Sequence, residues 1–296
     1  MEQSGNKLVY IIMPSKAFLH EEDIPKNQRM DVPETQIHDV FLEFADQKNL
    51  NVIDFQKYFL ENQNNIPYPI FPKHGIHISE YAETIVMDSL MKYVENIQSK
   101  DLYDHSITDP IETTIPQRRD EDIAVALNLK TPLVNDETLA YTKIKLVRRD
   151  RENEPRVLVI GDSFYWGLYP RVKGHGLFKR YEFWYRNHQV FPSPKNKKQF
   201  SSQAKCLESL KGFDITFVMA TSNAMDYAGW GYFDTLHKLR TKDFVAPDSL
   251  LAIYKVVDRI KANNVLLESV KMKALERNIS LDSMLFLDAK WIYERR

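Results

Sequence analysis

The sequence of 296 residues contains a single cysteine, Cys206. One cysteine excludes an internal disulfide framework and a zinc site built from several thiolates. No stretch approaches the roughly 18 consecutive apolar residues that a membrane-spanning helix needs, and we recognise no export signal. Internal repeats and low-complexity segments are also lacking. With 43% apolar residues, the composition is that of a globular protein with an ordinary core.

The chain also lacks an excess of charge of either sign. It has 40 basic and 41 acidic residues and a net charge of −1, so nothing in its overall field attracts nucleic acid or an anionic membrane. A nucleotide site is not indicated, because the glycines after Ile160 do not form a dinucleotide-binding or phosphate-binding loop. Aromatic residues make up 12%, which fits either carbohydrate binding or a well-packed core.

Apolar spacing predicts alternating strands and helices. Residues 8–13 form a short apolar run typical of a buried strand, residues 34–48 have helical spacing, and residues 50–55 form a second strand. This order predicts a parallel sheet with a crossover helix. Residues 60–72 are rich in Asn and Pro and are expected to form a loop. A helix is predicted over residues 80–98, with Ser79 as its N-cap.

The remaining chain continues the pattern. Strands are predicted at residues 156–160 and 213–221, a packed strand and loop at 177–190, a short helix at 120–129, and helices over 250–260, 264–276 and 281–294. We therefore predict an α/β fold, a three-layer parallel sheet in residues 1–245. Residues 246–296 are predicted to be a helical C-terminal extension packed on it.

The central strand ends in Gly161-Asp162-Ser163. A glycine can take the geometry of a tight turn, and Asp162 or Ser163 can cap the following helix. Open α/β sheets bind ligands at this edge, so Ser163 is a candidate nucleophile with backbone donors beside it. The same residues also fit an ordinary turn between a strand and a helix.

A serine nucleophile needs a nearby base, for which histidine is the usual residue. His74 and His77 are closely spaced just before the helix predicted at residue 80, on a loop of the kind that often carries chemistry. A zinc site at this His-x-x-His pair lacks a third ligand motif nearby. His77 is therefore the candidate base.

The two blocks together resemble a known family. The serine block, residues 156–168, resembles that of SGNH hydrolases, and the block order resembles the alginate O-acetylation proteins of the AlgJ/AlgX group. Gly75-Ile76-His77-Ile78-Ser79 falls where that group has an Asp-x-His-Trp-Ser/Asn motif. Residues 8–25 are similar to its first strand and loop. The resemblance covers roughly residues 8–235 and implies a flavodoxin-like SGNH fold.

The resemblance implies that Ser163 is the nucleophile, that His77 is the general base, and that the Ser163 N–H contributes to an oxyanion hole. Gly161, Asn223 and Trp166 are further candidates for substrate or oxyanion contacts.

This chain departs from the motif at two positions, because Gly75 stands at the place of the triad aspartate and Ile78 at that of the Trp. Three other carboxylates are candidates to replace the triad acid: Asp162, Glu80 and Asp226. Asp162 is also a candidate catalytic residue.

The function implied is that of a serine esterase or O-acetyltransferase acting on acetylated polysaccharide of the cell envelope, in the periplasm, with other acetylation proteins as partners. No metal or cofactor is implied, and neither nucleic acid nor a membrane span is expected. One alternative is a carbohydrate-binding relative that lost the acid, which Gly75 and Ile78 favour. Another is a scaffold protein of an envelope assembly, with the helical extension as its interface.

Overall fold

The computed structural model describes residues 5–29, 36–131, 133–193, 199–241, 247–277, 279 and 281–295. It divides into two compact units: Met1–Ser201 with Leu210–Gly231, and Ser202–Ser209 with Tyr232–Arg296. The second unit contains the predicted extension at residues 246–296 together with Ser202–Ser209 and the residues from Tyr232 onward. Packing of the helical extension on the first unit stays a prediction.

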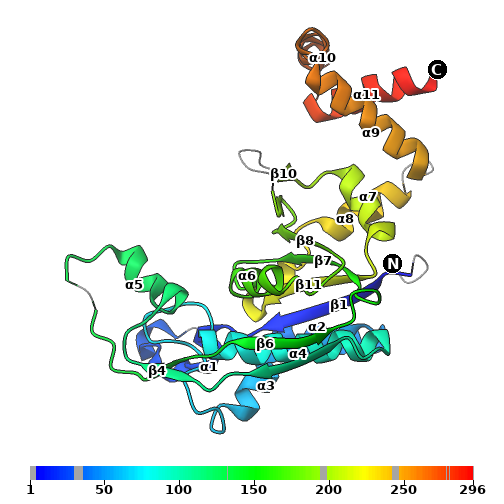
Figure 1. Cartoon of the computed structure of the whole chain (residues 1–296). Helices are drawn as coiled ribbons and strands as arrows, with labels where there is room; N and C mark the ends of the chain where they lie inside the picture. The colour runs from blue at the N-terminus through cyan, green and yellow to red at the C-terminus, as the bar shows by residue number, and fades with distance from the viewer. Residues whose placement is uncertain are drawn as a thin grey trace. The chain divides into compact units, whose positions relative to one another are not determined.

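The first unit is built on a seven-stranded sheet (Figure 1). Its order is β10-β9-β8-β7-β11-β1-β2. The strands are β1 (Lys7–Met13), β2 (Asn51–Asp54), β7 (Arg156–Gly161), β8 (Arg180–Tyr185), β9 (Gln189–Phe191), β10 (Gln199–Phe200) and β11 (Ile215–Thr221). From β2 to β8 all neighbours are parallel, whereas β9 and β10 are antiparallel. The mostly parallel α/β sheet is confirmed. The antiparallel edge follows because the short turn after β8 leaves no room for a crossover.

Alternating residues of the buried strands divide the core into two faces. Val9, Ile11 and Met13 of β1 belong to the large core cluster, whereas Ile12 belongs to a second cluster. The first cluster includes residues of α3 (Phe55–Asn62), α4 (Glu80–Gln98) and α6 (Tyr165–His175). The second includes residues of α2 (Ile37–Gln47) and the 3-10 helix η5 (Ser222–Tyr227). Helices on both faces of the sheet give the three layers that the sequence predicted.

Local capping explains where the helices begin. Ser79 is the N-cap of α4, as predicted, and its side chain accepts a hydrogen bond from the Ala82 N–H at 3.2 Å. Asp54 caps α3 in the same way through the Lys57 N–H at 2.9 Å. This cap ends the second strand one residue earlier than expected and places a helix over the first part of the expected loop at 60–72. The start of the helix predicted from residue 34 lies outside the described residues.

A long connection leaves the sheet after α4 and returns before β7 (Figure 1). It contains β3 (Tyr103–Ile107), β4 (Ile111–Thr113), the 3-10 helix η4 (Arg118–Glu121), α5 (Asp122–Leu127), β5 (Leu139–Tyr141) and β6 (Ile144–Arg149). Two small antiparallel ladders, β3 with β6 and β4 with β5, close it. The helix predicted over 120–129 is thus divided into η4 and α5, and the ladders were not predicted.

The other helices are short or belong wholly or partly to the second unit. In the first unit, α1 (Lys16–Leu19) follows β1, and two 3-10 turns follow at Glu21–Asp23 and Lys26–Gln28. The helix α7 (Gln203–Gly212) is divided between the units. The second unit contains α8 (Tyr232–Thr241), α9 (Pro247–Ala262), α10 (Asn264–Glu276) and α11 (Leu281–Glu294). The last three are helices as the apolar spacing predicted, and they share a core that was not predicted. None of the described helices combines the length and apolar character needed to cross a bilayer.

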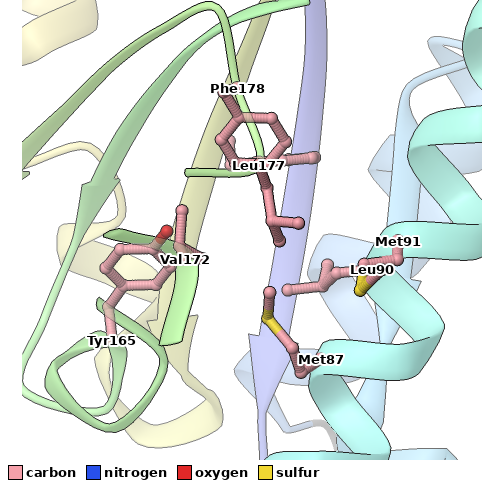
Figure 2. Close-up of a pocket in the computed structure, with 8 residues that line it drawn as sticks. Met87, Leu90, Met91, Tyr165, Val172, Leu177 and Phe178 are labelled. Carbon is pink, nitrogen blue, oxygen red and sulfur yellow. The ribbon is translucent and has the colours of Figure 1, made fainter. Parts of the chain in front are cut away.

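One apolar pocket lies between α4 and α6 (Figure 2). Met87, Leu90 and Met91 of α4 point toward Tyr165 and Val172 of α6. The lining includes neither a serine nor a histidine, and the Tyr165 hydroxyl accepts a hydrogen bond from the Tyr181 hydroxyl at 2.9 Å. The pocket is therefore a gap in helix packing and holds none of the candidate site residues.

Candidate active site

Ser163 lies where β7 leaves the sheet. Residues 157–160 are fully buried in β7 and lie between β8 and β11, so the end of this strand is fixed on both sides. Ser163 is half-buried, and its backbone N–H makes no hydrogen bond within the described part of the chain. The turn therefore presents both a hydroxyl and a free backbone donor at the carboxyl edge of the sheet, where α/β proteins bind ligands.

Asp162 braces this turn. One carboxylate oxygen accepts the Phe164 N–H at 2.9 Å, and the other accepts the N–H of Thr221 at 2.9 Å and its hydroxyl at 3.2 Å. Burial raises the pKa of Asp162, whereas these hydrogen bonds lower it. Both oxygens are used to tie the exits of β7 and β11 together, so Asp162 does not orient the histidine.

His77 is held by a loop that leads into α4. The Lys16 ammonium group donates to three backbone carbonyls of that loop, those of Pro72 at 2.7 Å, Lys73 at 2.9 Å and Gly75 at 2.9 Å. Burial lowers the pKa of Lys16. Because a single half-buried cation binds these three carbonyls, the backbone before His77 has one defined path.

The segment that begins α5 supplies a carboxylate to this loop. Asp122 is the first residue of α5, and one of its oxygens accepts the Ile76 N–H at 2.8 Å. Its other oxygen is hydrogen-bonded to Nδ1 of His77. In return, the His74 carbonyl accepts the N–H groups of Ile123 at 3.1 Å and Ala124 at 3.3 Å. The loop and the helix start therefore cap each other.

The other ring nitrogen of His77 faces the serine. The distance between Nε2 of His77 and Oγ of Ser163 is 2.9 Å. With a proton on Nδ1 donated to Asp122, Nε2 has a free lone pair to accept the Ser163 hydroxyl. A serine, a histidine and an orienting carboxylate in this order have the geometry of a Ser-His-Asp triad.

The surroundings favour a neutral imidazole. The His77 side chain is 13% exposed and packs edge-on against the Phe164 ring at 4.9 Å. Burial lowers the pKa of His77, the positive charge of Arg119 lowers it further, and Asp122 and Asp162 oppose both effects. A neutral histidine is the form that can take a proton from serine.

Gly75 has a steric reason to be glycine. A methyl group built at this position would lie 2.8 Å from Cγ of Pro72 and 3.1 Å from the carbonyl oxygens of Arg119 and Asp120. The backbone of the segment that carries Asp122 therefore fills the space that a side chain two residues before His77 would need. The carboxylate on the histidine comes from Asp122 instead.

The structure thus places a different carboxylate on His77 from the three that the sequence suggested. Glu80 faces Arg171, with 3.5 Å between Nη2 of Arg171 and Oε2 of Glu80. Asp226 is an exposed residue of η5. Asp122 was missed because it lies 45 residues beyond His77 in an irregular connection. The one signal for it was a carboxylate near the start of the short predicted helix.

The other candidate residues have separate positions. Gly161 ends β7, its carbonyl accepts the Arg186 N–H at 2.8 Å, and an added methyl group would lie 3.3 Å from the Met219 carbonyl oxygen. Close strand packing, rather than a left-handed turn, therefore favours glycine there. Trp166 packs in an aromatic cluster with Tyr169, Phe183, Tyr185 and Phe191.

Asn223 lies at the exit of β11, the strand beside β7. It is exposed, and it follows Thr221, which the Asp162 carboxylate holds, by two residues. Its side chain makes no hydrogen bond within the described part of the chain. The amide is therefore free to donate to a ligand on the same edge as Ser163.

Neither candidate histidine belongs to a group of metal ligands among the described residues. Nε2 of His74 lies 3.0 Å from the Val134 carbonyl oxygen, and both nitrogens of His77 are engaged as described above. In the described ranges, the one group of three possible ligands is His20, Glu22 and Asp23, of which the two carboxylates are exposed. Exposed groups of this kind are common without a metal.

The fold and the site define the molecule as an α/β protein in which a serine, a histidine and an aspartate are connected by hydrogen bonds at the carboxyl edge of the sheet. No protein-family model matches the chain, and no curated protein matches it. Several solved structures, however, are similar to the chain.

The chain is similar to the O-acetyltransferase domain of Pseudomonas putida AlgJ, at 14% identity and a TM-score of 0.41, over 82% of this chain and 71% of that one. It is similar to Bacillus cereus PatB1 at 11% identity and a TM-score of 0.47, over 75% and 85%. It is also similar to Pseudomonas aeruginosa AlgX at 11% identity and a TM-score of 0.47, over 79% and 58%. AlgJ and AlgX name the group whose motifs the sequence resembles.

Proposed function

We propose that the protein is a serine esterase or O-acyltransferase that uses Ser163, His77 and Asp122 as its triad. The observation that carries the proposal is the pair of contacts on one imidazole: Asp122 on Nδ1, and Ser163 Oγ 2.9 Å from Nε2. Nucleophile, base and orienting acid then act as one unit, in which the acid fixes the tautomer and stabilises the imidazolium that forms.

In the first half-reaction, Ser163 Oγ attacks the carbonyl carbon of the ester and its proton passes to Nε2 of His77. The bond from that carbon to the alkoxy oxygen then breaks, and the departing oxygen takes the proton from His77. In the second half-reaction, water or a sugar hydroxyl gives its proton to His77 and attacks the acyl-serine. The Ser163 oxygen leaves and recovers the proton. Water gives an esterase and a sugar hydroxyl gives a transferase.

The negative charge on the tetrahedral oxygen needs donors. The Ser163 N–H and the Asn223 side chain, both without partners in the described part of the chain, fit that role at the shared edge of β7 and β11. A donor of this kind typically contributes about 3 kcal/mol to transition-state stabilisation. Gly161 contributes by letting the two strands lie close together, and Asp162 by bracing the turn.

The sequence resemblance extends the proposal in three ways. The group transferred is acetyl, the substrate is an acetylated carbohydrate, and the location is the cell envelope. The same holds for other acetylation proteins as partners. The mechanism above needs no metal or cofactor. The carbohydrate-binding alternative without catalysis was favoured by the missing aspartate at Gly75, and Asp122 on His77 removes that support.

The test is release of acetate from a small chromogenic acetyl ester by the full chain. Ser163→Ala and His77→Ala are expected to lose at least about 10³-fold in kcat, because each removes a member of the triad. Ser106→Ala, at an exposed serine of β3, is the matched control and should keep full activity. Wild-type turnover no higher than that of Ser163→Ala would contradict the proposal, and affinity for acetylated glycans without turnover would then establish the binding protein.

A further inference from the structure

Arg119 joins the serine turn to the segment that carries the acid. Its Nη2 donates to the Ser163 carbonyl oxygen at 2.8 Å, across 44 residues of sequence. Three residues after Arg119, Asp122 holds Nδ1 of His77. One short stretch of chain thus holds the nucleophile through its backbone and the base through its ring.

Arg119 is poorly satisfied for a purely structural arginine. Its Nη1 is buried and has no hydrogen-bond partner among the described residues. Arg149 shows the usual arrangement, with Nε and Nη2 on the Glu154 carboxylate at 2.7 and 2.8 Å and Nη1 on the His175 carbonyl at 2.7 Å. A buried N–H without an acceptor is destabilising. Arg119 therefore uses Nη2 on the serine turn, whereas its Nη1 has no acceptor among the described residues.

The charges around Arg119 stabilise its protonated form. Burial lowers the pKa of Arg119, and four carboxylates raise it again, those of Glu83, Asp122, Asp162 and Asp120. An arginine nevertheless stays protonated throughout the range in which proteins are folded. The guanidinium is therefore a permanent positive charge beside the base, and it acts against protonation of His77.

We propose that Arg119 is a positioning residue for the acyl transfer: it holds the Ser163 carbonyl from the segment that also carries Asp122, so that Oγ of Ser163 stays on Nε2 of His77. The inference rests on the proposed function. The charged groups that face His77 are Arg119 from η4, Asp122 from α5 and Asp162 from the turn after β7. Of these, Arg119 is the one cation.

The first experiment measures kcat and KM for the chromogenic acetyl ester against pH in Arg119→Met and Arg119→Lys. Arg119→Met should lower kcat by on the order of 10- to 100-fold with little change in KM, because a displaced serine reacts poorly although substrate binding is unaffected. The acid limb of its profile should move to higher pH, because loss of the cation raises the pKa of His77. In Arg119→Lys the acid limb of the pH profile should stay at the wild-type pH, because the positive charge is kept. Its kcat should be lower than that of the wild type, because the guanidinium that holds the Ser163 carbonyl is lost.

The matched control is Arg148→Met. Arg148 is an exposed arginine paired with Asp101 and Asp104 at 2.7 Å each, and no contact links it to His77 or Ser163 in the described part of the chain. Its loss should change neither kcat nor the acid limb. Circular dichroism would establish that all three variants are folded.

The second experiment follows the His77 ring protons by NMR during a pH titration and needs no turnover. The midpoint of His77 should rise in Arg119→Met and stay unchanged in Arg148→Met. A folded Arg119→Met protein with the wild-type midpoint overturns the inference, even if the wild type is an active esterase. If the wild type shows no turnover but the midpoint moves, the proposed reaction fails and the placement of Arg119 beside the base stands.

Discussion

Among the described histidines that are hydrogen-bonded to an aspartate, His38 and His77 differ in what the second ring nitrogen meets. Nε2 of His38 lies 2.9 Å from the Asp54 carboxylate, and its Nδ1 lies 3.2 Å from that of Asp39. His77 has one carboxylate, and its other nitrogen faces Ser163. The two carboxylates on His38 stabilise a protonated imidazole. The single carboxylate on His77 leaves the Nε2 lone pair free to accept the Ser163 hydroxyl.

The electrostatics follow from these partners. The hydrogen bond to Asp54 is the largest effect on His38, and the pKa of His38 is raised. Burial is the largest effect on His77, followed by the charge of Arg119, and the pKa of His77 is lowered. A histidine beside an aspartate is therefore not in itself a catalytic pair, because the remaining neighbours decide which protonation state is stable.

The largest expected difference between the two pairs concerns activity. Asp122→Asn should lower kcat for the acetyl ester by on the order of 10³- to 10⁴-fold, because the histidine loses its tautomer control and the stabilisation of its cation. Asp54→Asn should leave kcat unchanged. It should lower the unfolding midpoint in urea below about pH 6.5, because the protonated His38 loses its hydrogen bond to a charged carboxylate. Equal losses of kcat in both variants would contradict the distinction.

A second prediction concerns the path by which the acid reaches His77. Gly75→Asp places a carboxylate two residues before the histidine, as in the motif that the sequence resembles. We expect it to destabilise the fold by about 1–3 kcal/mol, because the new Cβ overlaps Pro72 and the backbone at Arg119 and Asp120. Urea unfolding measures the loss.

The same substitution combined with Asp122→Asn should leave the activity as low as in Asp122→Asn alone. Recovery of kcat to within tenfold of the wild type in the double variant would show that the site tolerates either source of the acid. In that case steric exclusion at Gly75 would be wrong.

The smallest expected effect is the separation of two titration midpoints. By NMR, His38 should titrate above its ordinary pKa of 6.5 and His77 below it. For His38 the raised pKa means that its contribution to stability is complete below about pH 6.5 and is lost as the pH rises through the folded-state value. For His77 the lowered pKa means that activity rises with pH below 6.5. Midpoints in the reverse order would contradict the comparison.

The parts of the site that the sequence predicted are those fixed by regular structure. The apolar run before Gly161 identified β7 and placed Ser163 at its exit, and Ser79 identified the start of α4, two residues after His77. In both cases a local pattern is enough, because the strand and the helix position the residue.

Asp122 and Arg119 could not be found in this way. They reach the site through a connection whose path depends on two small ladders and on the backbone packed against Gly75. No periodicity encodes such a path. Gly75 itself was informative in a way that only the structure explains, because a glycine at the place of the acid marks the close approach of another segment.

The most direct test of the triad is labelling by a fluorophosphonate, which reacts with an activated serine and needs no knowledge of the substrate. We predict a single adduct on Ser163 by intact mass and peptide mapping, with a rate that falls steeply in Asp122→Asn and is unchanged in Asp54→Asn. Absence of an adduct on Ser163, or one labelling rate in all three proteins, would contradict the claim that Asp122 and His77 activate this serine.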